Sequence, residues 1–195
     1  MRREARLYSA LAVAVLACII ILPGCTKPPI EEIAKAEKAL EGAKAKEADS
    51  YLEDGFKKAE AALKKAKDLL AQKEYKDAKS AAEAASSGAQ LLSSQVDAAK
   101  AKMKTDAEQT LQEVKAQTNE LKRLVADAVN KKIAINRDEA QTLIGKNEVD
   151  LINVKVRLET GKIRQAYDDL KVMKTQTAAQ KEKLMAALPP DPEKK

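Results

Sequence analysis

Hydrophobic residues recur every three or four positions over most of the chain between residues 30 and 188. The clearest run alternates spacings of three and four without a gap: Tyr75, Ala78, Ala82, Ala85, Ala89, Leu92, Val96, Ala99 and Met103. The residues from Leu52 to Leu70 follow the same rule. This heptad pattern is typical of amphipathic helices that pack on one another, and it differs from the strict alternation of a half-buried strand. It predicts an all-α fold of antiparallel helical hairpins in a coiled-coil-like bundle.

The positions of proline and of helix-start residues divide this pattern into helices. All six prolines lie outside residues 30–188, where each would cost about 3 kcal/mol in a helix interior. Ser50 and Asn136 each stand three residues before a glutamate, as N-cap residues do, and Gly161 is a natural helix stop. We predict helices near residues 30–47, 51–71, 75–103, 106–134, 138–160 and 163–187. Only a change of heptad phase near Thr105 separates the third from the fourth, so one long helix is the alternative.

Two parts of the pattern repeat at an offset of 88 residues. The residues Phe56, Leu63, Ala66 and Leu70 correspond to Ile144, Leu151, Val154 and Leu158, and the interruptions at 72–74 and 160–162 correspond as well. Earlier residues align less well: Ile33, Ala36 and Leu40 with Leu121, Leu124 and Ala128. Three positions of the second copy are polar where the pattern expects apolar residues: Asn147, Thr177 and Gln180. The repeat predicts two helical units, 30–103 and 104–188, by internal duplication, although heptad sequences also align in phase by chance. The polar positions are expected to select helix register or to loosen the second unit.

The N-terminal region has the form of a secretory signal. Arginines precede an uncharged run of 16 residues, Leu7 to Leu22, and Gly24 stands directly before Cys25. The ending Leu22-Pro23-Gly24-Cys25 resembles the lipobox of bacterial lipoproteins, although Pro23 is unusual in it. The resemblance implies that residues 1–24 are a signal peptide cleaved after Gly24, that Cys25 is lipidated, and that 25–29 form a short linker. In lipoprotein sorting, Thr26 in place of aspartate implies the outer membrane. An uncleaved transmembrane anchor and simple secretion are the alternatives.

Composition narrows the chemistry that the chain can perform. It has no histidine, and its two cysteines are Cys18 and Cys25, so the processed chain would have no disulfide and few metal or nucleophilic groups. The net charge is +6, but lysines alternate with acids, including the helix pairs Glu53/Lys57 and Glu60/Lys64, and no one-sided basic stripe with aromatics points to nucleic acid. The adjacent acids Asp168 and Asp169 are expected to lie on a solvated face. We therefore expect no enzyme activity, no catalytic residues, no metal site and no cofactor.

Residues 29–102 carry a family resemblance. The segments Ala36-Glu37-Lys38-Ala39-Leu40, Ala59-Glu60 and Lys73-Glu74-Tyr75-x-x-Ala78 resemble bacterial envelope lipoproteins of unknown function that contain Ala-rich, tetratricopeptide-like helical hairpins. No OmpA-like peptidoglycan-binding domain follows, and the resemblance supplies no catalytic residues. Together with the lipobox-like signal, the helical pattern and the missing catalytic groups, it leads us to expect a lipid-anchored, periplasm-facing interaction or spacer module. Its expected partners are the membrane, through Cys25, and a helical envelope protein or a second copy of the chain.

Two further features suggest partners. Tyr51, Phe56, Tyr75 and Tyr167 could line a partner groove, although the heptad pattern favours core packing for Phe56 and Tyr75. The tail 189–195, predicted to be disordered, ends in Lys195 and is in this respect similar to Braun's lipoprotein, which is joined to peptidoglycan through its C-terminal lysine. That similarity makes a cell-wall tether attached through Lys195 the alternative function. A merely soluble charged tail is the simpler explanation.

Overall fold

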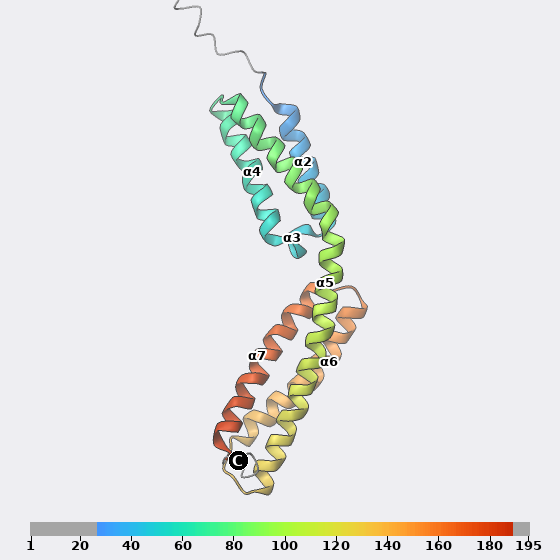
Figure 1. Cartoon of the computed structure of the whole chain (residues 1–195), viewed down its shortest axis with the longest axis vertical. Coiled ribbons are helices and arrows are strands. Elements are labelled where there is room, and N and C mark those ends of the chain that lie inside the picture. The colour runs from blue at the N-terminus through green and yellow to red at the C-terminus, as the bar shows by residue number, and fades with distance from the viewer. Residues whose placement is uncertain (1–26, 189–195) are drawn as a thin grey trace, which may run out of the picture.

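The computed structural model describes residues 27–188, and its regular structure in this range is entirely helical. The helices are α2 (Ile30–Ala45), α3 (Ala48–Tyr51), α4 (Glu53–Ala71), α5 (Tyr75–Asn130), α6 (Arg137–Glu159) and α7 (Ile163–Ala187). The predicted all-α bundle is confirmed. Figure 1 shows an elongated molecule in which α5 runs through both halves, with α2 and α4 beside its first half and α6 and α7 beside its second.

Helix α5 has 56 residues, which at 1.5 Å per residue is a length of about 84 Å. The alternative of one long helix in place of 75–103 and 106–134 is confirmed, although the helix ends at Asn130 and not at 134, and the division near Thr105 is wrong. No glycine or proline interrupts residues 89–130, and Thr105 donates its hydroxyl to the carbonyl of Ala101 instead of capping a new helix. Val96 and Ala107 are buried, and Met103 between them is partly exposed. The change of heptad phase therefore shifts the buried face of α5 without ending the helix.

We call α2, α3, α4 and residues 75–103 the first unit, and residues 104–130, α6 and α7 the second unit. Each unit is a three-helix bundle with its own buried core. The larger buried side chains of the first unit are Leu40, Phe56, Leu92 and Val96 in one cluster and Ile33 in a smaller one, with alanines in both. Those of the second unit fall into two clusters around Val114, Val154 and Leu170 and around Leu121, Ile144 and Leu184. Burial of these apolar faces is the main force that holds the units together.

The turns show how far the two units correspond. A residue with positive φ ends the first helix of each unit, at Glu47 and at Lys132, which are 85 residues apart. Another ends the second helix, at Lys73 and at the predicted stop Gly161, which are 88 residues apart. The turns at Lys73 and Gly161 have the same hydrogen-bond pattern: the Glu74 N–H donates to the Leu69 carbonyl, and the Lys162 N–H donates to the Arg157 carbonyl.

Burial in the first helix of each unit corrects the predicted alignment. The buried residues Ile33, Ala36, Leu40 and Ala43 recur 85 positions later as Thr118, Leu121, Val125 and Ala128. At an offset of 88, Ala36 would match Leu124, which is only partly buried. The interval between the two turns is therefore three residues longer in the second unit, close to one helical turn. The common origin of the units stays a prediction.

The two predicted N-caps had different outcomes. Asn136 caps α6 as predicted: its Oδ1 accepts the Glu139 N–H at 3.3 Å, and its Nδ2 donates to the Glu139 carboxylate at 3.0 Å. Ser50 does not cap α4. It lies within α3, and Leu52 occupies the N-cap position without a side-chain hydrogen bond. Glu47 has positive φ and α3 starts after it, so Ser50 falls inside this short helix and its N–H donates to the Glu47 carbonyl.

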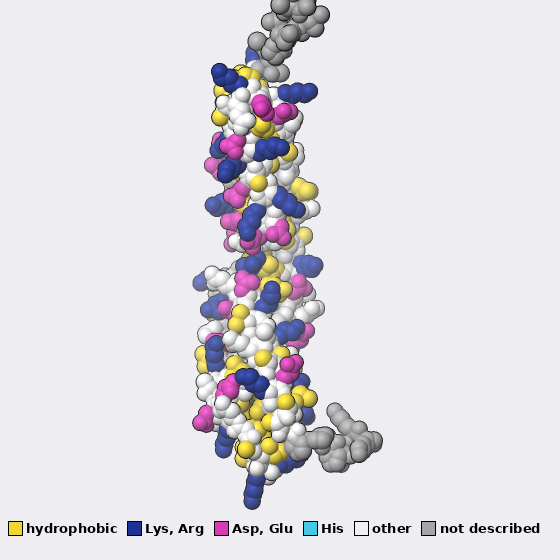
Figure 2. All heavy atoms as spheres, turned by 90° about the vertical axis from the view of Figure 1, so that its left-hand side faces the viewer, with side chains coloured by type: hydrophobic (Ala, Val, Ile, Leu, Met, Phe, Trp, Pro, Cys, Tyr) yellow, Lys and Arg dark blue, Asp and Glu magenta, His cyan; other side chains and the backbone are white. Residues whose placement is uncertain are grey.

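The surface is covered by charges of both signs. Figure 2 shows lysine and arginine side chains interleaved with acidic ones along the whole length of the displayed face. The predicted Glu53–Lys57 pair forms at 2.6 Å, but among the described side chains no ion pair joins Glu60 to Lys64. Within residues 27–188, no helix combines the length and the apolar character that crossing a membrane requires.

Candidate functional site

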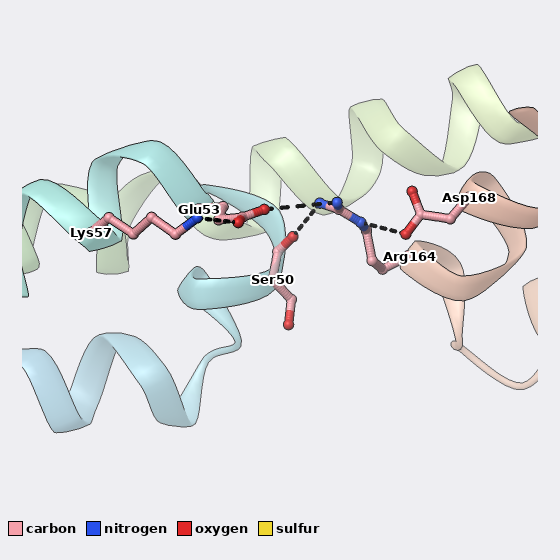
Figure 3. Close-up of polar contacts among 5 residues, drawn as sticks. All are labelled: Ser50, Glu53, Lys57, Arg164 and Asp168. Carbon is pink, nitrogen blue, oxygen red and sulfur yellow. Dashed lines mark hydrogen bonds and ion pairs between the residues drawn. The ribbon is translucent and has the colours of Figure 1, made fainter.

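The most extensive polar contact between the two units is built around Arg164, at the start of α7. Its Nη1 donates to the backbone carbonyl of Ser50 in α3 at 2.7 Å, and its Nε donates to Asp168 Oδ2 at 2.8 Å (Figure 3). Its Nη2 lies 3.9 Å from a carboxylate oxygen of Glu53 in α4. The guanidinium thus joins residues 114 positions apart in the chain and bridges the units beside α5.

The electrostatics of this contact are those of a structural clamp. The hydrogen bond to Asp168 raises the pKa of Arg164, so the guanidinium stays charged. The pKa of Glu53 is lowered, chiefly by its hydrogen bond from Lys57, and Arg164 adds to the lowering. Arg164, Glu53 and Asp168 all remain partly exposed. The arrangement can therefore fix how the two units meet.

A groove of about 590 Å³ runs between α2 and α4 in the first unit. We call it the α2–α4 groove. Its floor contains the apolar side chains of Leu40, Phe56 and Leu63, and its walls carry six charged residues: Glu37, Glu41, Lys44, Glu60, Lys64 and Lys67. An ion pair of 2.7 Å between Lys67 and Glu37 crosses it. An apolar floor with charged rims suits an amphipathic helix of another chain.

The four aromatic residues of the described range 27–188 do not gather into one partner site. Phe56 is 5% exposed in the core of the first unit, as the heptad pattern favoured. Tyr51 and Tyr167 pack at the edges of different cores, with the ammonium groups of Lys100 and Lys171 at 5.2 and 5.6 Å from their ring centres. Tyr75 is partly exposed at the start of α5. Their main contribution is packing and cation–π contact.

A buried polar layer crosses the second unit and takes one residue from each of its helices. Asn147 of α6 donates from Nδ2 to the hydroxyls of Thr118 at 3.1 Å and Thr177 at 2.7 Å. Thr177 gives its own proton to the Met173 carbonyl, so it can only accept from Asn147, and this fixes the orientation of the amide. The Oδ1 atom of Asn147 is buried without a hydrogen-bond partner. The heptad pattern had predicted Asn147 and Thr177 as polar positions but not Thr118, and the third predicted position, Gln180, is buried outside this hydrogen-bonded layer.

The residues predicted for lipidation, cleavage and wall attachment, Cys25, Gly24 and Lys195, lie outside the described residues. The acids Asp168 and Asp169 point to different partners, Arg164 and Arg157, and do not form a paired-carboxylate site. Within residues 27–188, no three His, Cys, Asp or Glu side chains are grouped so that they could hold a metal ion.

Compared with known proteins, the chain matches no family, no curated protein and no solved structure. The resemblance of residues 29–102 to envelope lipoproteins therefore stays a prediction.

Proposed function

We propose that this protein is a lipid-anchored lipoprotein of the bacterial cell envelope, held at the outer membrane and facing the periplasm. In this proposal it acts without catalysis, as a spacer and protein-interaction module. The observation that carries the proposal is the placement of the two ends of the described chain. Helix α2, which begins five residues after the lipobox-like Cys25, starts at one end of the elongated molecule, whereas α7 ends at the other (Figure 1).

A spacer needs a stiff element along its length, and α5 supplies one. It continues through both units without a break, and the clamp at Arg164 adds a lateral contact where the units meet. An anchor at residue 25 would place the first unit near the membrane and project the second unit away from it. Several acyl chains on one cysteine would hold such a rod stably, since each buried CH₂ contributes about 0.8 kcal/mol.

Lipidation can be tested with a matched pair of cysteine variants. We expect Cys25→Ser to lose incorporation of labelled palmitate and to leave the membrane fraction, while Cys18→Ser, within the proposed signal, keeps both. Palmitate incorporation by Cys25→Ser, or loss of membrane association in both variants alike, would contradict the proposal.

The interaction role can be tested in the α2–α4 groove. We expect Leu63→Glu, which places a charge on the apolar floor, to abolish cross-linking to envelope proteins in intact cells. Leu91→Glu is the control, because Leu91 is exposed and does not line the groove. Equal cross-linking by both variants would exclude the groove as the docking surface.

A cell-wall tether is the second candidate, favoured by the end at which α7 stops. Helix α7 ends at Ala187, at the end of the rod opposite to α2, so in this proposal an attachment through Lys195 would join the wall to that end. A tether would stay with peptidoglycan sacculi in boiling detergent, and Lys195→Arg would release it. Muropeptide mass spectrometry should then show an adduct on Lys195, and its absence would leave the spacer and interaction role alone.

A further inference from the structure

The outer face of α6 carries an apolar line that no other helix covers. Of the eight large apolar side chains that are exposed among the described residues, three lie on this line within eight positions: Val149 (59% exposed), Ile152 (67%) and Val156 (51%). Gly145 extends it by four residues, and a Cβ added there would meet no heavy atom within 4 Å. The buried residues of α6, such as Ala140, Asn147 and Val154, lie on the opposite side of the helix.

The spacing of this line is itself a heptad. The steps from Gly145 to Val149, Ile152 and Val156 are four, three and four residues, the a and d positions of a two-stranded coiled coil. Valine and isoleucine form helices less readily than the lysine, glutamate and alanine that cover the rest of the surface, and they are apolar. Neither helix propensity nor contact with water therefore favours them at these exposed positions. The residue type and the spacing both indicate a partner helix.

From this face we propose that the protein forms a two-fold symmetric dimer in which the α6 helices of two copies pack antiparallel along this line. We call the four residues the α6 seam. The antiparallel register places Val149 opposite Ile152 of the second copy and Gly145 opposite Val156, so large residues alternate with the small one. The proposal depends on the described helices and not on the proposed lipid anchor.

Charges beside the seam favour the antiparallel direction. Glu148 and Lys155 both occupy g positions, and an antiparallel pair brings g residues of the two helices together. Each Glu148 would then face a Lys155 of the other copy, twice by symmetry. In a parallel pair, Glu148 would face Asn153 and Lys155 would face Thr160, without ion pairs. The two side chains are 54% and 73% exposed, and Glu148 also holds Lys122 of its own α5.

A dimer of this kind joins the second units and leaves the first units free. The groove between α5 and α6, lined by Leu111, Leu151 and Ile152, borders the seam and widens the apolar surface available to the second copy. The two first units would extend away from the joined region in opposite directions, because the paired α6 helices are antiparallel. An interface of one helix per copy is small, so we expect a reversible dimer.

The test uses a chain of residues 26–195, which keeps every residue of the four core clusters. Sedimentation velocity over a range of concentrations should show a reversible monomer–dimer equilibrium. Ile152→Glu should weaken the dimer by more than about tenfold, because each copy would then bury a charge against Val149 of the other. Val172→Glu on α7, at a residue of similar exposure, is the control and should leave the dimer unchanged. Both variants should keep the thermal unfolding of the parent, since both side chains are exposed.

Engineered cysteines report the direction of pairing, since residues 26–195 contain none. Val156→Cys alone should form no disulfide, because the two residues 156 would lie about 16 Å apart along an antiparallel pair. Adding Gly145→Cys should give interchain disulfides. A charge swap completes the test: Glu148→Lys should weaken the dimer, and combining it with Lys155→Glu should restore it. A monomer at all concentrations, a dimer that survives Ile152→Glu, or a disulfide from Val156→Cys alone would each overturn the proposal.

Discussion

The two units have the same three-helix arrangement but fill one layer of their cores in different ways. In the first unit, α4 and α5 contribute Ala59 and Ala89, and both are buried. At the predicted offset of 88, the second unit has Asn147 and Thr177, which bond to each other and, through Asn147, to Thr118. Small side chains let two helices approach closely, whereas a polar layer needs a partner for each buried polar atom.

The difference has a consequence for how each unit is stabilised. Close contact in the alanine layer is visible at Gly88, where an added Cβ would lie 3.6 Å from the Cβ of Ala59. In the polar layer, the unpartnered Asn147 Oδ1 costs about 1–3 kcal/mol of stability. What such a layer supplies in return is register, because only one alignment of the three helices pairs the amide with both hydroxyls. We expect the first unit to depend on packing and the second on packing together with polar specificity.

The largest effect should come from the one large ring in the alanine-rich core. We predict that Phe56→Ala destabilises the first unit by about 3–5 kcal/mol, because the surrounding alanines cannot fill the cavity. Urea unfolding followed by circular dichroism measures the loss. The matched change in the second unit is Ile144→Ala, which should cost about 2–4 kcal/mol, since Ile144 is smaller and has leucines and valines around it. A smaller loss for Phe56→Ala than for Ile144→Ala would contradict the view that the first unit depends on this side chain.

Moving the polar residue into the alanine layer should be nearly as costly. We predict that Ala59→Asn destabilises the first unit by about 2–3 kcal/mol, because the helices leave no room and no partner for the amide. The neighbouring Glu60→Asn is the control. It is exposed, so its effect should stay within about 0.5 kcal/mol in the same urea experiment. Equal effects of the two changes would show that the alanine layer is not tightly packed.

These differences mark what the sequence could and could not predict. Heptad spacing and the absence of proline predicted the helices, and local capping chemistry predicted Asn136 and Gly161, because these signals depend on neighbours within a few residues. Continuity of α5 remained open, since a shift of heptad phase looks the same in a bent chain and in a helix that changes its buried face. Thr118 was missed for that reason: it continues the pattern of Val114, Leu121 and Val125 only after the shift.

The contact between the units was out of reach for a different reason. Arg164 and Ser50 are 114 residues apart, and the residues around an arginine near the start of a helix do not indicate which distant carbonyl it will bind. The capping pattern at Ser50 was also misleading, because Ser50 lies within α3 and α4 starts only after Leu52. The candidate surfaces of the α2–α4 groove and the α6 seam likewise depend on which helix faces remain uncovered after folding.

A moderate effect of opposite sign should follow from removing the polar layer. We predict that Asn147→Leu stabilises the second unit by about 1 kcal/mol, because it removes the unpartnered Oδ1 and adds apolar volume. The loss of register should be visible at the same time as broadened side-chain NMR signals from α6. Asn153→Leu, at an exposed position of the same helix, is the control and should change neither the unfolding midpoint nor the line widths. A strong destabilisation by Asn147→Leu would mean that the layer contributes net stability and not specificity.

The smallest effect should come from the clamp between the units, and it should alter their coupling more than their stability. Arg164→Met removes the bond to the Ser50 carbonyl, which is worth about 1 kcal/mol, and the first and second units should then exchange amide hydrogens more independently.

The pKa of Glu53 gives an independent readout by NMR titration. It should rise when Arg164 is lost but stay below its ordinary value, because Lys57 is the main cause of the lowering. A carboxyl group whose pKa is lowered by folding stabilises the fold above its unfolded-state pKa. The contribution of Glu53 to stability should therefore be lost as the pH falls from the unfolded-state pKa through the folded-state pKa, in parent and variant alike. A pKa of Glu53 that does not respond to Arg164→Met would show that the guanidinium does not sit beside it in solution, and the two units would then be joined by α5 without the clamp.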